Sequence, residues 1–224
     1  MIWRVIWELT FFCVFLGALL FWPAGTFDWW GGWAYIVQMA VGGTATCIWL
    51  LVRDPALLRE RLSGGFEKKQ ASRDKIVMAL FYVGFLGWLV LMALDRRWGI
   101  SHMPRALNYA GFIVSSLFFV TNVLVFRANS FAAPVVKMQE ERNQKVATTG
   151  PYRVVRHPMY AGGLFYFFGL PFLFGSWLGL AVAPLFVVLL MLRIPIEERM
   201  LRNNLAGYDD YAVHVRYRLV PGVW

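Results

Sequence analysis

The sequence predicts an all-α polytopic membrane protein, and its composition and the spacing of its apolar runs support that prediction. Hydrophobic residues make up 59% of the 224 positions and charged residues only 16%, which is too apolar for an ordinary soluble domain of this length. Crossing a bilayer takes about 20 mostly apolar residues per helix, and runs of this kind recur along the chain. We therefore expect a single integral-membrane domain over residues 1–224.

The predicted spans follow one another with polar loops between them. They lie at about residues 5–22, 31–52, 76–94, 107–126 and 177–195. A further run at about 161–175 is short and contains Gly162 and Gly163, and only Gly175 and Ser176 separate it from the last span. We expect these two runs to form a helical hairpin, with the Gly-Gly pair at a close contact between helices.

The basic residues predict the orientation of the spans. With both termini in the cytoplasm, only Arg96, Arg97 and Arg105 of the 22 lysines and arginines fall on the other side, as the positive-inside rule expects. The sequence thus predicts an integral protein of a bacterial inner membrane. The net charge of +9 is explained by a basic rim against anionic lipid, so we expect the bilayer as a partner and no nucleic acid.

Signals for export and for metal binding are weak. The first apolar run is long and has no small-x-small cleavage site, so we expect a retained helix and not a removed signal peptide. Cys13 and Cys47 both fall inside spans, without a neighbouring cysteine or clustered histidine. We expect two free thiols and no metal site.

The loop before the hairpin is predicted to be partly extended. Residues 131–138 are apolar and include Val135 and Val136, residues 139–143 are polar and turn-like, and the pattern resumes at 144–149. This alternation favours a short β-hairpin or a pair of extended segments, which Gly150 and Pro151 would end.

Two polar clusters flank the predicted hairpin. The first is Gly-Pro-Tyr-Arg-Val-Val-Arg-His-Pro-Met-Tyr at 150–160, in which Pro158 suits the first turn of a helix. The second runs from Arg193 to Glu198, where Arg193 and Glu197 share a helix face. The hairpin would bring both clusters to one membrane face, and a C-terminal helix and tail after Gly207 would fold back as a lid.

The order of these motifs resembles a known family. Gly150-Pro151-Tyr152, Arg156-His157-Pro158-x-Tyr160, the helical hairpin, Glu197-Glu198-x-x-Leu201 and Tyr208-x-x-Tyr211 occur in the same order as in the isoprenylcysteine carboxyl methyltransferase family and its phospholipid methyltransferase relatives. The resemblance covers about residues 129–224. It divides the domain into four variable spans at 1–126 and a methyltransferase core at 127–224.

The resemblance implies an integral-membrane methyltransferase that uses S-adenosyl-L-methionine and acts on a small or lipid-like acceptor. Arg193 corresponds to the family's substrate-facing arginine and is the catalytic candidate. The positions that correspond to cofactor contacts are Gln139, Gln144, Lys145, Val146, Ala147, Tyr152, His157, Pro158, Met159, Tyr160, Glu197 and Glu198. A difference of about one residue before Tyr208 leaves the two glutamates interchangeable, and the Arg-x-x-x-Glu spacing favours Glu197.

The residue types also fit methyl transfer by themselves. A carboxylate such as Glu197 could hold the ammonium or the ribose of the cofactor, and tyrosine faces could lie against its adenine or sulfonium. Backbone N–H groups at 144–147 could bind the adenine edge. Arg193 could hold a substrate carboxylate through a bidentate contact, so a carboxylate acceptor is favoured, with thiols and phospholipid amines still open. No GxGxxG motif follows a predicted strand.

Simpler interpretations, without a ligand, also fit these residues. Arg153 and Arg156 are typical of lipid-facing anchors, and His157 could only mark a helix start. Arg193 and Glu197 could be an i, i+4 ion pair at the membrane surface. Residues 95–97 suggest a solvated outer loop.

Two other functions also fit the sequence. One is an NADPH-dependent membrane reductase of the sterol-reductase type, and the other is a non-catalytic membrane scaffold. Binding of S-adenosylhomocysteine, of NADPH or of neither would separate these two functions from methyl transfer.

Overall fold

A computed structural model describes residues 2–63, 72–134 and 138–224 and confirms the predicted all-α polytopic fold. Six long helices account for most of the described chain. They are α1 (Ile2–Ala24), α2 (Trp30–Arg53), α4 (Ser72–Trp98), α5 (Arg105–Ala128), α6 (Pro158–Phe174) and α7 (Trp177–Asn204). The shorter elements are α3 (Pro55–Leu62), η1 (Glu140–Arg142), η2 (Gly150–Arg153) and α8 (Tyr208–His214).

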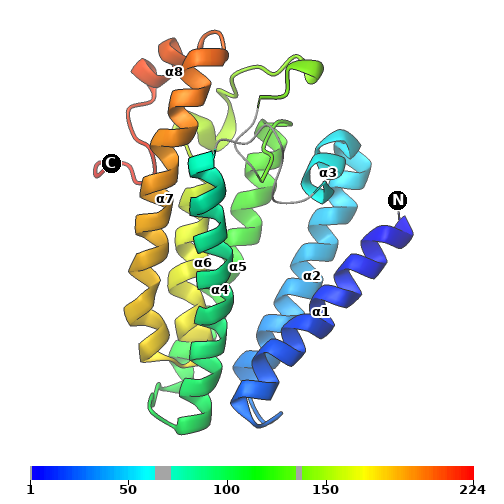
Figure 1. Cartoon of the computed structure of the whole chain (residues 1–224), viewed down its shortest axis with the longest axis vertical. Helices are drawn as coiled ribbons and strands as arrows, with labels where there is room; N and C mark the ends of the chain where they lie inside the picture. The colour runs from blue at the N-terminus through cyan, green and yellow to red at the C-terminus, as the bar shows by residue number, and fades with distance from the viewer. Residues whose placement is uncertain (1, 64–71, 135–137) are drawn as a thin grey trace.

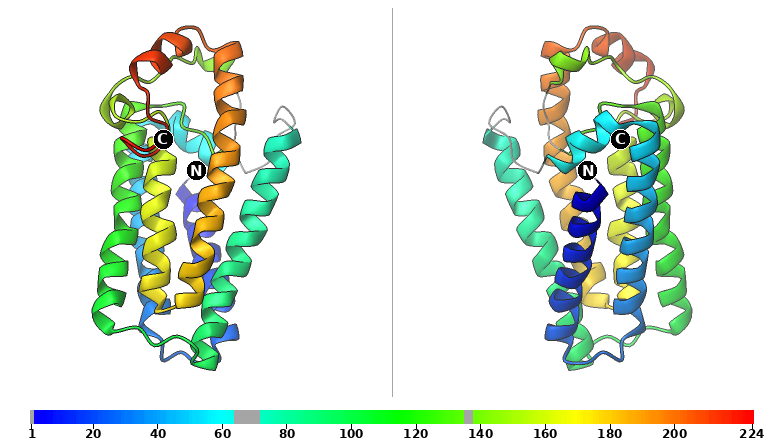
Figure 2. Two further views of the ribbon diagram at one scale, coloured as in Figure 1. Left: turned by 90° about the vertical axis from the view of Figure 1, so that its left-hand side faces the viewer. Right: turned by 90° about the vertical axis from the view of Figure 1, so that its right-hand side faces the viewer.

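The long helices run alternately up and down in one bundle (Figure 1). Five of them are long and apolar enough to cross a membrane, and α6 is a shorter apolar helix. Figure 2 shows α3, α8 and the long loops at the upper end, together with both chain termini, and short connections at the lower end. Any polar site built from the long loops therefore lies at the upper end.

The predicted hairpin of α6 and α7 is present. Gly175 ends α6 with φ +75°, a left-handed conformation that favours glycine. Ser176 is the N-cap of α7, and its hydroxyl accepts a hydrogen bond from the Gly179 N–H at 2.9 Å, which caps the helix. The two polar clusters at the other ends of these helices are thereby brought to the same end of the bundle.

Close contact between α5 and α6 depends on glycine. A Cβ at Gly111 of α5 would lie 2.2 Å from the Leu173 backbone N, and one at Gly169 of α6 would lie 2.5 Å from the Ser115 backbone N. Gly162 packs in the same way, with Thr121 side-chain atoms 2.7 Å from its Cβ position. Small residues of this kind let membrane helices approach closely, and the predicted packing role is confirmed for Gly162.

Replacing Gly111 with alanine is expected to destabilise the protein by at least about 1–3 kcal/mol, because the added methyl group meets backbone that cannot move alone. Thermal unfolding of the purified protein in detergent measures the effect. Gly87→Ala is the matched control, because nothing lies within 4 Å of the Cβ position at Gly87 in α4. Equal unfolding temperatures for the two variants would contradict the packing argument.

The predicted β-hairpin was wrong for the described part of its segment. Residues 131–134 and 138–149 contain the 3₁₀ turn η1 and irregular chain, with no β-strand. The Gln139 N–H donates to the Gln144 side-chain oxygen at 2.9 Å, and the Gln139 amide donates to the Phe131 carbonyl at 2.9 Å. Glutamine side chains thus satisfy backbone groups that a hairpin would have paired across strands. Val135 and Val136 lie outside the described residues.

The expectation of a solvated outer loop at 95–97 was wrong for Asp95. Helix α4 continues to Trp98, and Asp95 is only 1% exposed. Its carboxylate accepts hydrogen bonds from the Ser101 N–H at 2.9 Å and from the hydroxyls of Ser101 and Ser176. Asp95 therefore joins the lower ends of α4 and α7, because buried carboxylates need such donors.

Candidate active site

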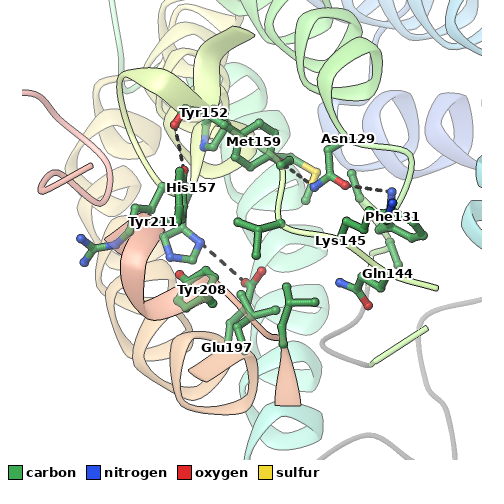
Figure 3. A pocket seen from close by; sticks show the side chains of 18 of the residues that line it. Asn129, Phe131, Gln144, Lys145, Tyr152, His157, Met159, Glu197, Tyr208 and Tyr211 are labelled. Carbon is green, nitrogen blue, oxygen red and sulfur yellow. Dashed lines mark hydrogen bonds and ion pairs between the residues drawn. The ribbon is translucent and has the colours of Figure 1, made fainter. Parts of the chain in front are cut away.

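A polar cavity of about 90 Å³ lies at the upper end of the bundle. Its walls come from the first turns of α6, the last turns of α7, helix α8 and the loop between α5 and α6 (Figure 3). Predicted site residues that line it are Gln144, Lys145, Val146, Ala147, Tyr152, His157, Pro158, Met159, Tyr160 and Glu197. Segments far apart in the sequence thus contribute to one small cavity.

Two of the predicted cofactor-binding residues, Gln139 and Glu198, do not line this cavity. Gln139 is fully buried beneath the loop, where its side chain bonds Phe131 and also accepts from Arg142 at 2.5 Å. Gln139 therefore supports the cavity wall without lining the cavity. Arg193 lines a neighbouring cavity described below.

The two adjacent glutamates have different surroundings. Glu197 faces the cavity with its side chain 26% exposed, and its carboxylate accepts a hydrogen bond from the Tyr160 hydroxyl at 2.6 Å. The His157 Nδ1 atom lies 3.9 Å from the same carboxylate. Glu198 points elsewhere, with its side chain only 5% exposed. Of the two, Glu197 is the carboxylate that lines the cavity.

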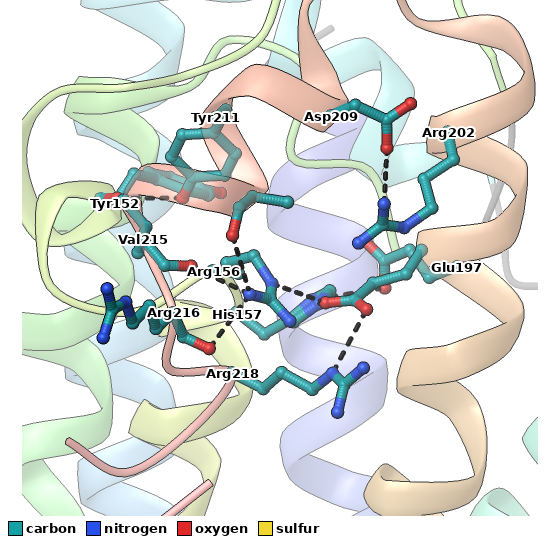
Figure 4. A network of polar contacts seen from close by, with 12 residues as sticks. Tyr152, Arg156, His157, Glu197, Arg202, Asp209, Tyr211, Val215, Arg216 and Arg218 are labelled. Atoms are coloured by element: carbon teal, nitrogen blue, oxygen red, sulfur yellow. Dashed lines mark hydrogen bonds and ion pairs between the residues drawn. The ribbon is translucent and has the colours of Figure 1, made fainter. Parts of the chain in front are cut away.

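Glu198 binds two arginines, Arg156 before α6 and Arg218 in the C-terminal tail, both of which Figure 4 labels. Its carboxylate accepts from Arg156 Nε at 2.7 Å and from Arg218 Nε at 3.1 Å. His157 Nε2 lies 3.3 Å from it on the third side. This carboxylate therefore joins α7, the start of α6 and the tail.

Arg156 was wrongly interpreted as a lipid anchor, since it is buried and bound inside the protein. Besides Glu198, its guanidinium donates to the carbonyls of Val215 at 2.8 Å and Arg216 at 3.0 Å. The N–H groups of Arg156 and His157 also donate to tail carbonyls, those of Tyr217 at 2.9 Å and Arg218 at 3.0 Å. Arg153 is exposed, as expected of a rim residue.

Helix α8 covers the cavity with two tyrosines. The Tyr211 hydroxyl donates to the Tyr152 carbonyl at 2.8 Å, and the Tyr152 hydroxyl accepts from Asn129 at 2.8 Å. Tyr208 is 4% exposed, and its hydroxyl has no hydrogen-bond partner within the described chain. Burial raises the pKa of Tyr152, Tyr208 and Tyr211 above the usual phenol value, so all three keep their protons at neutral pH.

Helix α3 supports the cavity wall through a half-buried arginine that the sequence did not single out. Arg61 donates to the Ala132 carbonyl at 2.9 Å, and its guanidinium lies 4.5 Å from the Phe126 ring centroid. Burial lowers the pKa of Arg61 to about 10, which still leaves it charged at neutral pH. The first half of the chain thereby fixes the loop that carries Phe131 and Ala132.

A second, mostly apolar cavity of about 190 Å³ lies beside the first. It is bounded by α4, α5, α6 and α7, and Figure 2 shows α4 diverging from α7 toward the upper end. Met159 and Tyr160 line both cavities. The polar and the apolar cavity therefore meet at these two side chains.

Arg193 lines the apolar cavity and pairs with a residue far away in the sequence. Its Nε donates to the Asp74 carboxylate of α4 at 2.9 Å, and its Nη2 donates to the Pro134 carbonyl at 2.9 Å. Its guanidinium also lies over the Tyr160 ring, 5.6 Å from the centroid. The structure thus pairs Arg193 with Asp74, where the sequence had offered an ion pair with Glu197.

The fold and the cavities define a class of protein. It is an integral-membrane protein with a polar site at one end of its bundle and an apolar cavity between helices beside that site. Within the described residues, no group of three or more histidine, cysteine, aspartate or glutamate side chains is arranged to hold a metal ion.

Comparison with known families finds a match for part of this chain. The family model for phospholipid methyltransferase matches residues 107–206, from α5 to just beyond α7. The predicted resemblance is confirmed over these residues, which are similar to the phospholipid methyltransferase family. The match indicates a membrane methyltransferase. A comparison with curated proteins found no match.

Proposed function

We propose that the protein is an S-adenosylmethionine-dependent methyltransferase of an amphiphilic acceptor that enters from the bilayer. The observation that carries the proposal is the meeting of two cavities at Met159 and Tyr160. The polar cavity presents the Glu197 carboxylate, and the apolar one presents the Arg193 guanidinium. A two-substrate transfer needs such an arrangement, because the donor and the acceptor must meet in line.

The residues of the polar cavity fit the proposed cofactor. The buried Tyr208 hydroxyl has no hydrogen-bond partner among the described residues, and a buried donor of this kind calls for a ligand acceptor. Glu197 can accept from an ammonium or from ribose hydroxyls, and the His157 and Tyr160 rings stack with centroids 5.6 Å apart beside it. When bound, S-adenosylmethionine would supply a methyl group from its sulfonium.

Entry of the cofactor requires the lid to open. The cavity volume of about 90 Å³ is below the roughly 300–1,000 Å³ of typical ligand sites. Helix α8 and the tail close one side, and they are held by polar contacts and by a small apolar cluster around Tyr208, Tyr211 and Ala212. An outward shift of α8 would enlarge the cavity without disturbing the membrane helices.

The acceptor is proposed to place an apolar portion between α4 and α7 and its reactive group near Tyr160. Arg193 could orient an acceptor carboxylate there, and such a carboxylate would share the guanidinium with Asp74. An isoprenylcysteine-type carboxylate is the favoured acceptor, with thiols and phospholipid amines as the alternatives. The site would face the cytoplasm of a bacterial inner membrane.

Titrating the purified protein separately with S-adenosylhomocysteine and with NADPH tests the proposal. We expect saturable binding of S-adenosylhomocysteine and none of NADPH. Binding of NADPH instead would replace methyl transfer with reduction, and binding of neither would favour a scaffold. Mass spectrometry of membranes incubated with isotopically labelled S-adenosylmethionine would then identify the methylated acceptor.

Tyr208→Phe is expected to weaken S-adenosylhomocysteine binding by about 2–10-fold, the loss of one hydrogen bond to a ligand. Thermal stability without ligand should not fall, because the hydroxyl bonds nothing in the described protein. Tyr211→Phe is the matched control, since it removes the bond to the Tyr152 carbonyl and should lower stability without ligand. Unchanged ligand affinity in Tyr208→Phe would show that its hydroxyl does not meet the cofactor.

A further inference from the structure

A large polar cavity lies at the end of the bundle opposite the candidate active site. Its volume is about 500 Å³, and it is enclosed by the α1–α2 connection, the α4–α5 connection and the turn between α6 and α7. These connections all lie at the lower end in Figure 1. The side chains that characterise it are Asp28, Trp30, Arg96, His102, Arg105 and Tyr109. Methyl transfer at the upper end makes no use of this cavity.

The charges of the cavity wall suit a singly charged anion. Arg96 and Arg105 contribute two positive charges and Asp28 one negative charge, so these three side chains leave one net positive charge. Arg96 is held in place because its Nη2 donates to the Asp28 carbonyl at 3.1 Å. A guanidinium has five N–H donors, so the others can serve a ligand. A phosphodiester carries one negative charge and offers two oxygens to such donors.

The surroundings of the cavity suit a lipid. Trp30 and Tyr109 are exposed beside it, and their rings meet at right angles with centroids 5.0 Å apart. Tryptophan and tyrosine of membrane proteins favour the depth of the lipid headgroups. The cavity also lies at the ends of helices that are long enough to span a bilayer. A phosphodiester would therefore arrive here attached to acyl chains.

Two helix ends add to the attraction for an anion. Helix α2 begins at Trp30 and α5 begins at Arg105, and no side chain caps the first turn of either helix. Both first residues line the cavity. The N–H groups and positive dipole ends of helices favour anions, which supports the two arginines.

We propose that this lower cavity binds the phosphodiester headgroup of a phospholipid in the leaflet opposite the active site. The lipid would bridge α2, the end of α4 and the start of α5 through Trp30, Arg96 and Arg105. It is a bound structural lipid and not the methyl acceptor, since the two sites lie at opposite ends of the bundle (Figure 1). The proposal does not depend on the reaction at the upper end.

Binding of short-chain phospholipids to the full-length protein, purified in a sugar-based detergent, tests the proposal. Dihexanoyl phosphatidylcholine and dihexanoyl phosphatidylglycerol should both bind, as measured by native mass spectrometry and by a rise in unfolding temperature. Arg96→Gln and Arg105→Gln should each weaken binding by about tenfold, the effect of losing a charged hydrogen bond. Both side chains are exposed, so unfolding without lipid should be unchanged.

Arg97→Gln is the matched control, because it removes the same charge one position away. Arg97 does not line the cavity and lies over Gly25, with its Cζ 3.6 Å from the Cβ position there. An equal loss of affinity in Arg97→Gln would overturn the proposed site, as would equal binding of dihexanoylglycerol, which has no phosphate. Inorganic phosphate binding as tightly as the phospholipids would overturn the lipid as the source of the anion.

Discussion

Replacing Glu198 with alanine is expected to release the C-terminal tail and to destabilise the protein by about 3–5 kcal/mol. The substitution leaves Arg156 buried without its carboxylate partner, and an unpaired buried charge is costly. Arg218 loses its partner as well. Trypsin should then cut at Arg216 and Arg218 at much lower concentrations than in the wild type, and the thermal unfolding temperature should fall.

The control for this prediction is Asp209→Asn in the same region. Asp209 pairs with Arg202, but the two side chains are 65% and 44% exposed, and exposed ion pairs contribute only about 0–1 kcal/mol. The control should keep the tail protected from trypsin. A tail that stays protected in Glu198→Ala would show that the backbone contacts of residues 217 and 218 hold it without the ion pairs.

The membrane helices were predictable because their signal is local. An apolar run of sufficient length between polar loops requires a helix, since a lipid-exposed backbone must satisfy its own hydrogen bonds. The short α6 was found because Gly175 and Ser176 mark a turn. The irregular loop in the described part of 131–149 was not predicted, because β-branched residues favour a strand only weakly. Glutamine side chains, and not a second strand, bond its backbone there.

Motif spacing predicted which segments meet at the site, but it did not predict which side chains pair there. A hairpin between 150–160 and 193–198 necessarily brings Tyr160 near Glu197. The pairs Arg156–Glu198 and Arg193–Asp74 instead depend on which way each side chain turns and on the placement of α4. Asp74 and Arg193 are 119 positions apart, and no local pattern joins them.

The roles of Arg193 and Glu197 are expected to separate when each is replaced. Glu197→Gln removes the carboxylate that faces the polar cavity, so it should weaken S-adenosylhomocysteine binding by about tenfold or more. Arg193→Gln acts in the apolar cavity, so it should leave that affinity nearly intact. In Arg193→Gln, methylation of membranes by labelled S-adenosylmethionine should fall about 100-fold, because the acceptor is no longer held in position.

A second substitution distinguishes acceptor positioning from simple structural support. Arg193→Gln leaves the Asp74 carboxylate, which is 0% exposed, without this ion pair, so stability should fall. Adding Asp74→Asn removes the charge that Arg193 had paired and should recover much of the stability, because a buried pair of amides avoids the cost of desolvating ions. Methylation should stay low in the double variant if Arg193 contacts the acceptor. Recovery of methylation together with stability in the double variant would mean that Arg193 only fastens α7 to α4. Equal loss of S-adenosylhomocysteine binding in Arg193→Gln and Glu197→Gln would contradict separate roles for the two residues.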